Sequence, residues 1–188
     1  GLFSWGDSAK ACYENTVELI AQAQNWLQQT REKRQVKVFG GARFESLPDN
    51  ERDAALQTLM PLLRGLCSQD SHKVLHLNTS PEVLAFVNSH DLEPLAQMGT
   101  SCPDHFLRTK IQPLIVPESL YTQPVATLRE SLGRLIDAYR EAYTAYHQRC
   151  KRPNSPGLRD PNPVVVLLPR IGMVTICLLY TSDAADEG

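Results

Sequence analysis

The densest group of reactive side chains lies in a short polar segment, residues 99–110. The segment contains a thiol, a carboxylate, an imidazole and two cations: Cys102, Asp104, His105, Arg108 and Lys110. His105, Arg108 and Lys110 could converge on a phosphate or carboxylate, since arginine offers a bidentate fork and lysine a point charge. On an extended strand, Arg108 and Lys110 would face the same side. We therefore predict that these three residues bind substrate.

Two other interpretations of this segment stay open. Asp104 could cap a turn and pair locally with Arg108, in which case the cluster binds nothing. Cys102 could act as a thiol nucleophile or metal ligand beside Asp104 and His105, but residues this close in sequence rarely point at one another.

The histidines and cysteines predict no metal site. His72 and His76 are four residues apart, but the H-E-x-x-H glutamate is missing and the segment alternates like a strand. On a strand this spacing separates the two side chains by roughly 13 Å. The five cysteines are widely spaced and include no CxxC pair, which favours a reduced, cytoplasmic chain over a disulfide scaffold.

Two long amphipathic helices are predicted, over residues 9–31 and 124–149. The apolar stripe of the first consists of Cys12, Tyr13, Thr16, Val17, Ile20, Ala23 and Leu27. Between them, the Ser46–Asp49 capping pattern predicts a helix that passes through Met60 and is kinked or interrupted by Pro61.

Shorter elements fill the rest of the chain. Residues 73–77 alternate like a strand, and residues 114–117 and 164–168 form apolar runs typical of buried strands. Ser80-Pro81 begins one short helix, and a second spans residues 91–98 with Gly99 as its stop. Strands that alternate with helices indicate an α/β fold.

Composition excludes several classes of protein. Of the 188 residues, 42% are hydrophobic and 21% charged, which argues against disorder. The formal charge of −2 gives no support for binding to nucleic acid or to an anionic membrane. No apolar run is long enough to span a bilayer. No signal peptide is visible, and the chain is expected to begin inside a longer protein because its first residue is Gly1.

The C-terminal residues, Cys177 to Gly188, resemble a translated sequencing adapter. They run from a short apolar stub into a small acidic tail and match no folding element. We therefore expect native sequence to stop near Thr175 or Ile176 and the tail to pack poorly.

Four longer segments carry a family resemblance: residues 5–16, 39–48, 99–110, and Asp160-Pro161-Asn162-Pro163 through Met173. Together they resemble the bifunctional rhamnulose-1-phosphate aldolase/short-chain alcohol dehydrogenase family, of the class II aldolase type. The similarity covers essentially residues 1–175.

The resemblance implies a cytoplasmic bacterial enzyme. Its aldolase domain would use Zn²⁺ to cleave a ketose 1-phosphate, rhamnulose 1-phosphate, into dihydroxyacetone phosphate and lactaldehyde. The ion would polarise the ketose oxygens and stabilise the enediolate. A dehydrogenase domain would then act on lactaldehyde with NAD. The full protein is expected to bind a sugar-phosphate substrate and to form a homo-oligomer.

The resemblance places both catalytic centres outside this chain. The zinc-binding histidine would lie just before Gly1, the other ligands and the acid/base glutamate further upstream, and the dinucleotide-binding glycines downstream. This chain is therefore expected to hold no catalytic residue, no zinc and no NAD, and to be inactive alone.

The resulting domain prediction has three parts. Residues 1–38 would be the C-terminal strand and helix of a class II aldolase domain, residues 39–176 a truncated, degenerate aldolase-like α/β domain, and residues 177–188 the tail. The alternative is a non-catalytic α/β module whose 99–110 loop binds an anion or a neighbouring subunit.

An internal echo supports the degenerate domain. Val164 to Met173 resembles the aldolase strand that leads into a segment like Gly1-Leu2-Phe3, with Ile171 at the zinc-ligand position. This predicts that residues 164–168 form a central or near-central strand pairing with residues 74–77 or 114–116. Because the tail replaces the helix that should follow, about 100–200 Å² of that strand is expected to be exposed, making the chain prone to aggregation.

Overall fold

A computed structural model describes residues 3–69 and 71–178. The chain divides into two compact units between Gly40 and Gly41, near the boundary expected after residue 38. Unit 1 is residues 1–40 and unit 2 is residues 41–188.

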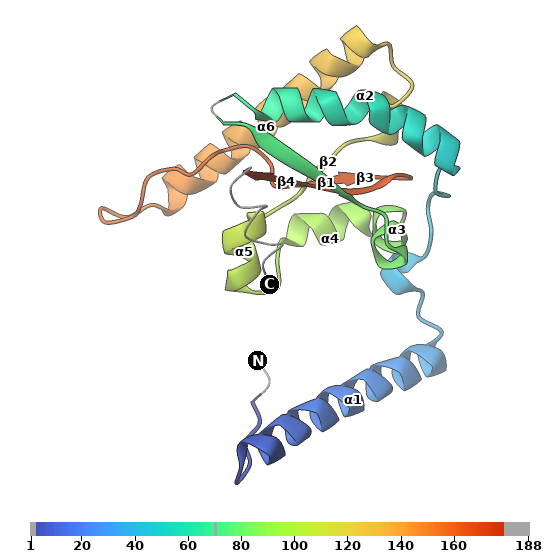
Figure 1. Ribbon diagram of the computed structural model, residues 1–188, viewed down its shortest axis with the longest axis vertical. Helices are drawn as coiled ribbons and strands as arrows, with labels where there is room; N and C mark the ends of the chain where they lie inside the picture. The colour runs from blue at the N-terminus through green and yellow to red at the C-terminus, as the bar shows by residue number, and fades with distance from the viewer. Residues whose placement is uncertain (1–2, 70, 179–188) are drawn as a thin grey trace. The chain divides into compact units, whose positions relative to one another are not determined.

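Unit 1 consists of the helix α1 (Ala9–Arg34) and a 3-10 turn, η1 (Val38–Gly40) (Figure 1). The Ser8 hydroxyl caps α1 by accepting a hydrogen bond from the Ala11 amide at 3.1 Å. Gln35 ends the helix in the left-handed conformation, with φ 49°. The predicted helix is therefore confirmed and is three residues longer than expected. None of its side chains is buried.

Unit 2 contains a four-stranded sheet and five α-helices among its described residues. Its elements in chain order are α2 (Asp49–Cys67), β1 (Lys73–Asn78), α3 (Pro81–Val87), α4 (Leu92–Met98), α5 (Pro103–Thr109), β2 (Leu114–Ile115), η2 (Glu118–Leu120), α6 (Val125–Cys150), β3 (Val165–Leu168) and β4 (Gly172–Leu178). The predicted α/β class is thereby confirmed.

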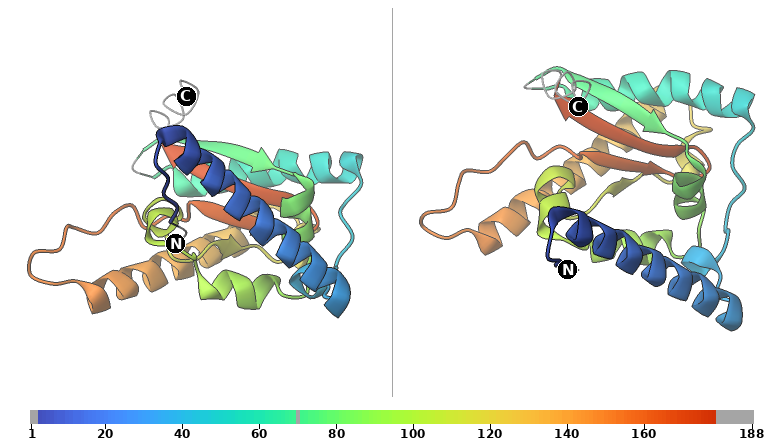
Figure 2. Two further views of the ribbon diagram at one scale, coloured as in Figure 1. Left: turned by 90° about the horizontal axis from the view of Figure 1, so that it is seen from below. Right: turned by 60° about the horizontal axis from the view of Figure 1, so that its bottom comes forward.

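The strand order is β1-β4-β3-β2 (Figure 2). β4 pairs antiparallel with both β1 and β3, whereas β2 pairs parallel with β3. β1, β2 and β3 therefore share one direction. Leu114 pairs with Val166 and Ile115 with Leu167, which confirms the predicted interior position of residues 164–168 and their pairing with 114–116.

Helices cover both faces of this sheet, with α2 and α6 on one side and α3 and α4 on the other (Figure 1). Val166 and Leu168 of β3 point into the first layer, and Leu167 into the second. All three side chains are buried. The prediction of an uncovered face on this strand is wrong, because α2 and α6 pack against one side and α3 and α4 against the other.

Three further predictions are corrected by the helices. Pro61 lies inside a continuous α2, whose buried face, Leu59, Leu63 and Cys67, extends past it. Ser46 does not cap α2; its hydroxyl accepts a hydrogen bond from the Asn88 amide at 2.9 Å. The segment read as a polar loop contains α5, which begins with proline at a position that favours helix starts.

The C-terminal boundary also differs from expectation. β4 continues through Cys177 and Leu178, the first two residues of the predicted tail, which pair with Val74 and Lys73. Strand pairing therefore crosses the position where native sequence was expected to stop. The remaining tail, including Leu179 and Tyr180, lies outside the described residues.

Gly99 does end α4, as predicted, with φ 80°. A side chain at this position would bring its Cβ within 2.6 Å of the Ile111 carbonyl oxygen, so both conformation and space require glycine. Within the described part of the chain, no helix combines the length and apolar character that a bilayer crossing needs.

Candidate functional site

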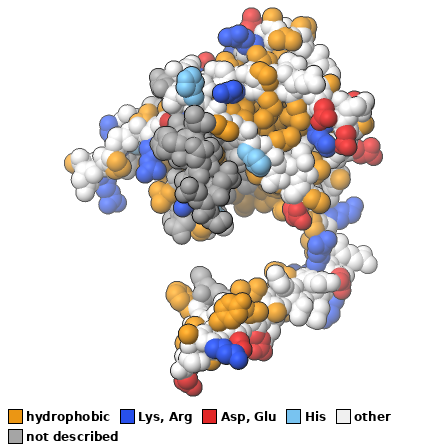
Figure 3. Space-filling view, viewed as in Figure 1, with side chains coloured by type: hydrophobic (Ala, Val, Ile, Leu, Met, Phe, Trp, Pro, Cys, Tyr) orange, Lys and Arg blue, Asp and Glu red, His pale blue; other side chains and the backbone are white. Residues whose placement is uncertain are grey.

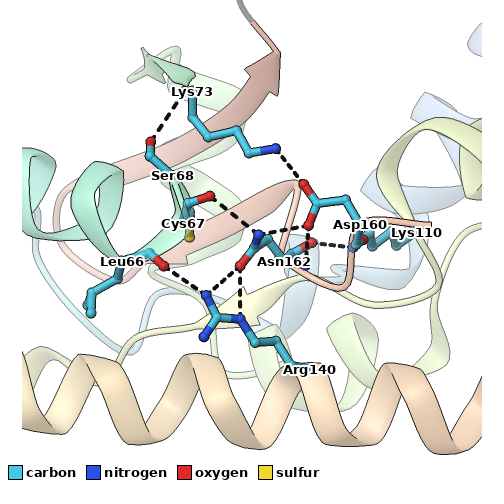
Figure 4. A network of polar contacts seen from close by, with 8 residues as sticks. All are labelled: Leu66, Cys67, Ser68, Lys73, Lys110, Arg140, Asp160 and Asn162. Atoms are coloured by element: carbon cyan, nitrogen blue, oxygen red, sulfur yellow. Dashed lines mark hydrogen bonds and ion pairs between the residues drawn. The ribbon is translucent and has the colours of Figure 1, made fainter. Parts of the chain in front are cut away.

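A network of polar side chains lies where β1, β2 and β3 begin (Figure 4). Lys73, Lys110 and Asn162 are buried, Arg140 is partly buried and the Asp160 side chain is 44% exposed. Its members come from four parts of unit 2. Lys73 is the first residue of β1, and Lys110 directly follows α5. Arg140 lies on α6, and Asp160 and Asn162 lie in the loop before β3. In α/β sheets, ligands bind outside the opposite, carboxyl ends of the strands. Position alone therefore favours a structural role for this network.

Asn162 is the centre of the network. Its amide oxygen accepts two hydrogen bonds from Arg140, from Nε at 2.9 Å and from Nη2 at 2.7 Å. Its amide nitrogen donates to the Asp160 carboxylate at 2.7 Å and to the Cys67 carbonyl at 3.3 Å. Arg140 Nη2 also donates to the Leu66 carbonyl at 2.7 Å. These bonds join the end of α2, the middle of α6 and the loop before β3.

Lys73 and Lys110 also bind the loop before β3. The Lys73 ammonium donates to the Asp160 carboxylate, and its side chain is only 5% exposed. The Lys110 ammonium donates to the backbone carbonyls of Asp160 and Asn162. It also lies over the rings of Tyr143 and Tyr139, at 4.3 and 5.9 Å from their centroids.

Burial shifts the protonation equilibria of this network. Burial lowers the pKa of Lys110 from 10.5 to about 8, although the nearby Asp160 carboxylate acts in the opposite direction. Burial likewise raises the pKa of the Cys67 thiol to about 11, so the thiol stays protonated at neutral pH. Burial alone would raise the pKa of Asp160, but hydrogen bonds from Lys73 and Asn162 hold it below its usual value.

The structure does not bring the three predicted substrate-binding residues together. His105 and Arg108 are exposed on α5, whereas Lys110 is buried, with 9% of its surface exposed. Lys110 has φ 64° after the end of α5, which turns its side chain into the polar network. The expected convergence fails because the segment is helical, so residues 108 and 110 do not share a face as they would on a strand.

The described residues do not fit Zn²⁺. They contain no group of three or more His, Cys, Asp or Glu side chains that could hold a metal ion. His72 and His76 are exposed; His76 lies in β1 and His72 directly before it. Cys67 lies in the polar network but its thiol is buried and protonated.

The chemistry open to the network is therefore limited. Each of its three cations already binds an oxygen of the protein, and its carboxylate accepts from Lys73 and Asn162. Its polar groups satisfy one another, which anchors the loop before β3. Sequence reasoning missed this site: Asp160 and Asn162 were noted only as part of a resembling segment, and neither type nor spacing linked them to Lys73 or Arg140.

Similarity to known proteins agrees with this fold. The sequence model of the family described as aldolase class II, second domain, matches residues 54–182. The chain belongs to the class II aldolase family. The match begins within α2 and continues to residue 182, past the position where native sequence was expected to stop.

A longer protein is similar in sequence to most of this class II aldolase chain. It is named uncharacterized oxidoreductase YuxG, from Bacillus subtilis (strain 168), and is 33% identical over 174 residues. The similarity covers 93% of this chain but only 25% of the relative, so this chain spans about a quarter of that protein. No solved structure matches the chain. The resemblance is thereby confirmed at the level of class II aldolases.

Proposed function

We propose that unit 2 is a non-catalytic second aldolase domain, which serves as a rigid scaffold within a longer protein. The observation that carries this proposal is the use of Lys73, Lys110 and Arg140 inside the fold. A sugar-phosphate site needs cations with free donors, whereas these three bind carbonyl, amide or carboxylate oxygens of the chain itself. The polar network then holds the domain together.

The activity we propose for the longer protein is the one that the sequence resemblance implies. It would cleave rhamnulose 1-phosphate to dihydroxyacetone phosphate and lactaldehyde, and a dehydrogenase domain would act on lactaldehyde with NAD. Membership of the class II aldolase family and the oxidoreductase name of the B. subtilis relative support this proposal. We further propose a cytoplasmic homo-oligomer.

Zn²⁺ and NAD would be bound by parts of the protein outside this chain. Zn²⁺ would supply the Lewis acid for carbon–carbon cleavage. Since the described residues do not fit this ion, we assign no reaction step to them. Unit 2 would contribute stability and the placement of its neighbours.

A direct test uses the 188-residue chain with rhamnulose 1-phosphate, with and without added Zn²⁺. Release of dihydroxyacetone phosphate would be followed by a coupled reductase assay. We expect no release above the buffer control in either condition. Turnover that requires Zn²⁺ and is lost on chelation would refute the scaffold role.

His105 and Arg108 support a second candidate function, binding of an anion at α5. Both side chains are exposed, and their spacing of three residues places them on one side of the helix. Inorganic phosphate should then raise the melting temperature, and Arg108→Ala should weaken that effect. Arg134→Ala, at an exposed arginine of α6, is the matched control. Equal phosphate effects in both variants would exclude this function.

A further inference from the structure

Residues 41–46 form a strap across the carboxyl end of β3, and the strap leads into α2. It runs beside α3 (Figure 1) and ends at Leu47, whose side chain packs against the core between α2, α6 and the sheet. Within the strap, Ala42 pairs antiparallel with Ser89 in an isolated β-bridge. In α/β sheets, ligands bind outside the carboxyl ends of the strands. The strap therefore lies where such a sheet would hold a ligand.

Asn88, directly after α3, is the main partner of the strap. It is 5% exposed, and its backbone carbonyl accepts hydrogen bonds from the amides of Arg43 at 2.7 Å and Phe44 at 3.1 Å. Its side-chain amide donates to the Ser46 hydroxyl at 2.9 Å. Its side-chain oxygen accepts a hydrogen bond from the Arg170 backbone N–H at 2.6 Å. One buried residue thus joins the strap to the turn that follows β3.

Arg170, in the turn after β3, provides the second attachment. Its guanidinium Nε donates to the Glu45 carbonyl at 3.1 Å, and its own carbonyl accepts a hydrogen bond from the Leu47 amide at 2.8 Å. Its φ is 67°, in the left-handed region that residues other than glycine rarely adopt. Contacts with the strap and with Asn88 hold Arg170 in this conformation.

The strap has little apolar packing of its own. Its residues are exposed or half-buried, and none is fully buried. An ion pair joins Arg43 to Glu93 of α4 at 3.9 Å, but both side chains are exposed, so the pair adds little. Near the start of α2, at the right of Figure 3, acidic and basic side chains are intermingled, so no single charge attracts the strap. Segments with few buried apolar contacts open at a lower free energy than the core.

We propose that the strap is a releasable cover of the carboxyl edge of unit 2, which opens without unfolding the sheet. Gly41, with φ 87°, is its hinge, and Leu47 is its fixed end. With the strap bound, the Asn88 amide and the Arg170 guanidinium donate to oxygens of the chain itself. With the strap released, both groups face solvent and the edge is open.

This inference rests on the scaffold role proposed above, because the bound strap explains what closes the domain to ligands. Its test measures strap release without substrate. The scaffold role could therefore fail in the turnover assay while the strap still opens, and the strap could stay closed in a domain that has no activity.

Amide hydrogen exchange of the 188-residue chain, resolved by residue with NMR, measures the opening directly. The amides of Arg43, Phe44 and His90 lose their acceptors when the strap leaves, because His90 donates to the Gly41 carbonyl at 3.0 Å. We expect these amides to exchange at least about tenfold faster than those of β3, yet more slowly than in an unstructured chain. Low concentrations of urea should leave their exchange nearly unchanged, because release of the strap exposes little surface.

Arg170→Gly separates strap release from loss of stability. It deletes the hydrogen bond to the Glu45 carbonyl and places glycine where φ is already left-handed, so the melting temperature should not fall. The exchange rates of the Arg43 and Phe44 amides should nevertheless rise about threefold to tenfold. Gln35→Gly, the same kind of change at a left-handed residue after α1, is the control and should leave these rates unchanged.

Ser46→Ala removes the other side-chain attachment, the hydrogen bond from the Asn88 amide. It should raise the exchange rates of the strap amides by a similar factor, because one hydrogen bond is again lost. Ser155→Ala is the control, since Ser155 is also exposed and its hydroxyl accepts one hydrogen bond, from the Arg152 amide at 2.9 Å.

Three results would overturn the proposal. Exchange of the strap amides at the rate of β3, with the same dependence on urea, would show that the strap opens only when unit 2 unfolds. Exchange at the rate of an unstructured chain would show that the strap is not bound. Equal effects of the Arg170 and Gln35 variants, or of the two serine variants, would show that these attachments do not hold it.

Discussion

The Asn162 amide oxygen accepts two hydrogen bonds from the Arg140 guanidinium, at 2.9 Å from Nε and 2.7 Å from Nη2. Arg140 lies on the longest helix of unit 2, and Asn162 in the loop before β3. Because the same asparagine also binds the Cys67 carbonyl, one side chain fixes the loop to both helices of the principal core.

Asn162→Ala should therefore destabilise unit 2 by about 2–4 kcal/mol. It removes hydrogen bonds to Arg140, Asp160 and Cys67, and it leaves a partly buried guanidinium and the carbonyl of a buried residue without these partners. Urea denaturation at neutral pH measures the loss. Asn154→Ala, in the exposed part of the same loop, is the control and should change stability by less than about 0.5 kcal/mol. Equal losses would show that the network contributes nothing specific.

Lys110 should give the free energy of unfolding a distinctive dependence on pH. Its pKa falls from 10.5 to about 8 on folding, since burial disfavours the charged ammonium. Between these values the unfolded chain binds more protons than the folded chain, so this group makes stability rise with pH. Lys110→Met removes that contribution. The stability of the unaltered chain minus that of the variant should therefore increase by about 1–3 kcal/mol from pH 8 to pH 10.

The comparison between chains is needed because other groups oppose this trend. The Cys67 thiol has a pKa raised to about 11, which lowers stability as the pH passes the value of the unfolded thiol. That contribution is common to both chains and largely cancels in the difference. Lys151→Met, at an exposed lysine, serves as the control. If the difference in the free energy of unfolding between the unaltered chain and Lys110→Met stays constant above pH 8, the lowered pKa of Lys110 is contradicted.

Asp160 should stabilise the fold at neutral pH and lose this effect in acid. Burial opposes its ionisation, but Lys73 and Asn162 hold its pKa below the ordinary value of 3.8. Its contribution is thus complete above pH 3.8 and disappears as the pH falls through the lower, folded value. Asp160→Asn should lower the free energy of unfolding by about 1–2 kcal/mol at pH 7. The expected loss is this small because the Asp160 side chain is 44% exposed, and solvent weakens its ion pair with Lys73.

The fall in stability below pH 4 is a more sensitive test of Asp160 than the stability at pH 7. Stability of Asp160→Asn should fall less steeply below pH 4 than that of the unaltered chain. Asp137→Asn removes a surface partner of Arg140 that is 64% exposed, and it should cost less than about 0.5 kcal/mol. Identical acid limbs for the unaltered chain and Asp160→Asn would exclude the proposed role of the Lys73 pair.

The glycines of unit 2 should respond to alanine with opposite signs. Gly172 has φ 149°, and a Cβ there would lie 2.6 Å from the Asn78 carbonyl oxygen, so Gly172→Ala should cost about 2 kcal/mol or more. Gly65 and Gly133 lie inside α2 and α6 with open space around the missing Cβ. Alanine at either helix position should stabilise by about 0.5–1 kcal/mol. Thermal denaturation of the three variants tests both signs.

Most elements could be predicted because their signals are local. The stripe of α6, the proline start of α3 and the aliphatic run of β3 depend on spacing within one segment. α5 was missed because its polar residues were read for their chemistry rather than for the proline that begins the helix. β4 was missed because a helix was expected to follow Met173 and because Cys177 and Leu178 were assigned to a foreign tail, whereas residues 173–178 pair with β1.

The polar network could not be predicted, for a different physical reason. Lys73 and Asp160 are 87 residues apart, and Lys110 and Asn162 are 52 apart. Such partners meet only through the strand order and the packing of α6, neither of which is written in local spacing. The burial of Lys110, which was predicted to bind substrate with His105 and Arg108, has the same origin, since the helical turn before it decides where its side chain points.

The position of β4 in the sheet also bears on the order of events during synthesis. β4 follows the other three strands in the sequence, yet it lies between β1 and β3. Val74 must wait for Cys177, about a hundred residues later, before it gains its partner. A nascent chain that ends before Gly172 would leave β1 unpaired on the ribosome. The sheet can therefore close only after nearly all of unit 2 has been translated.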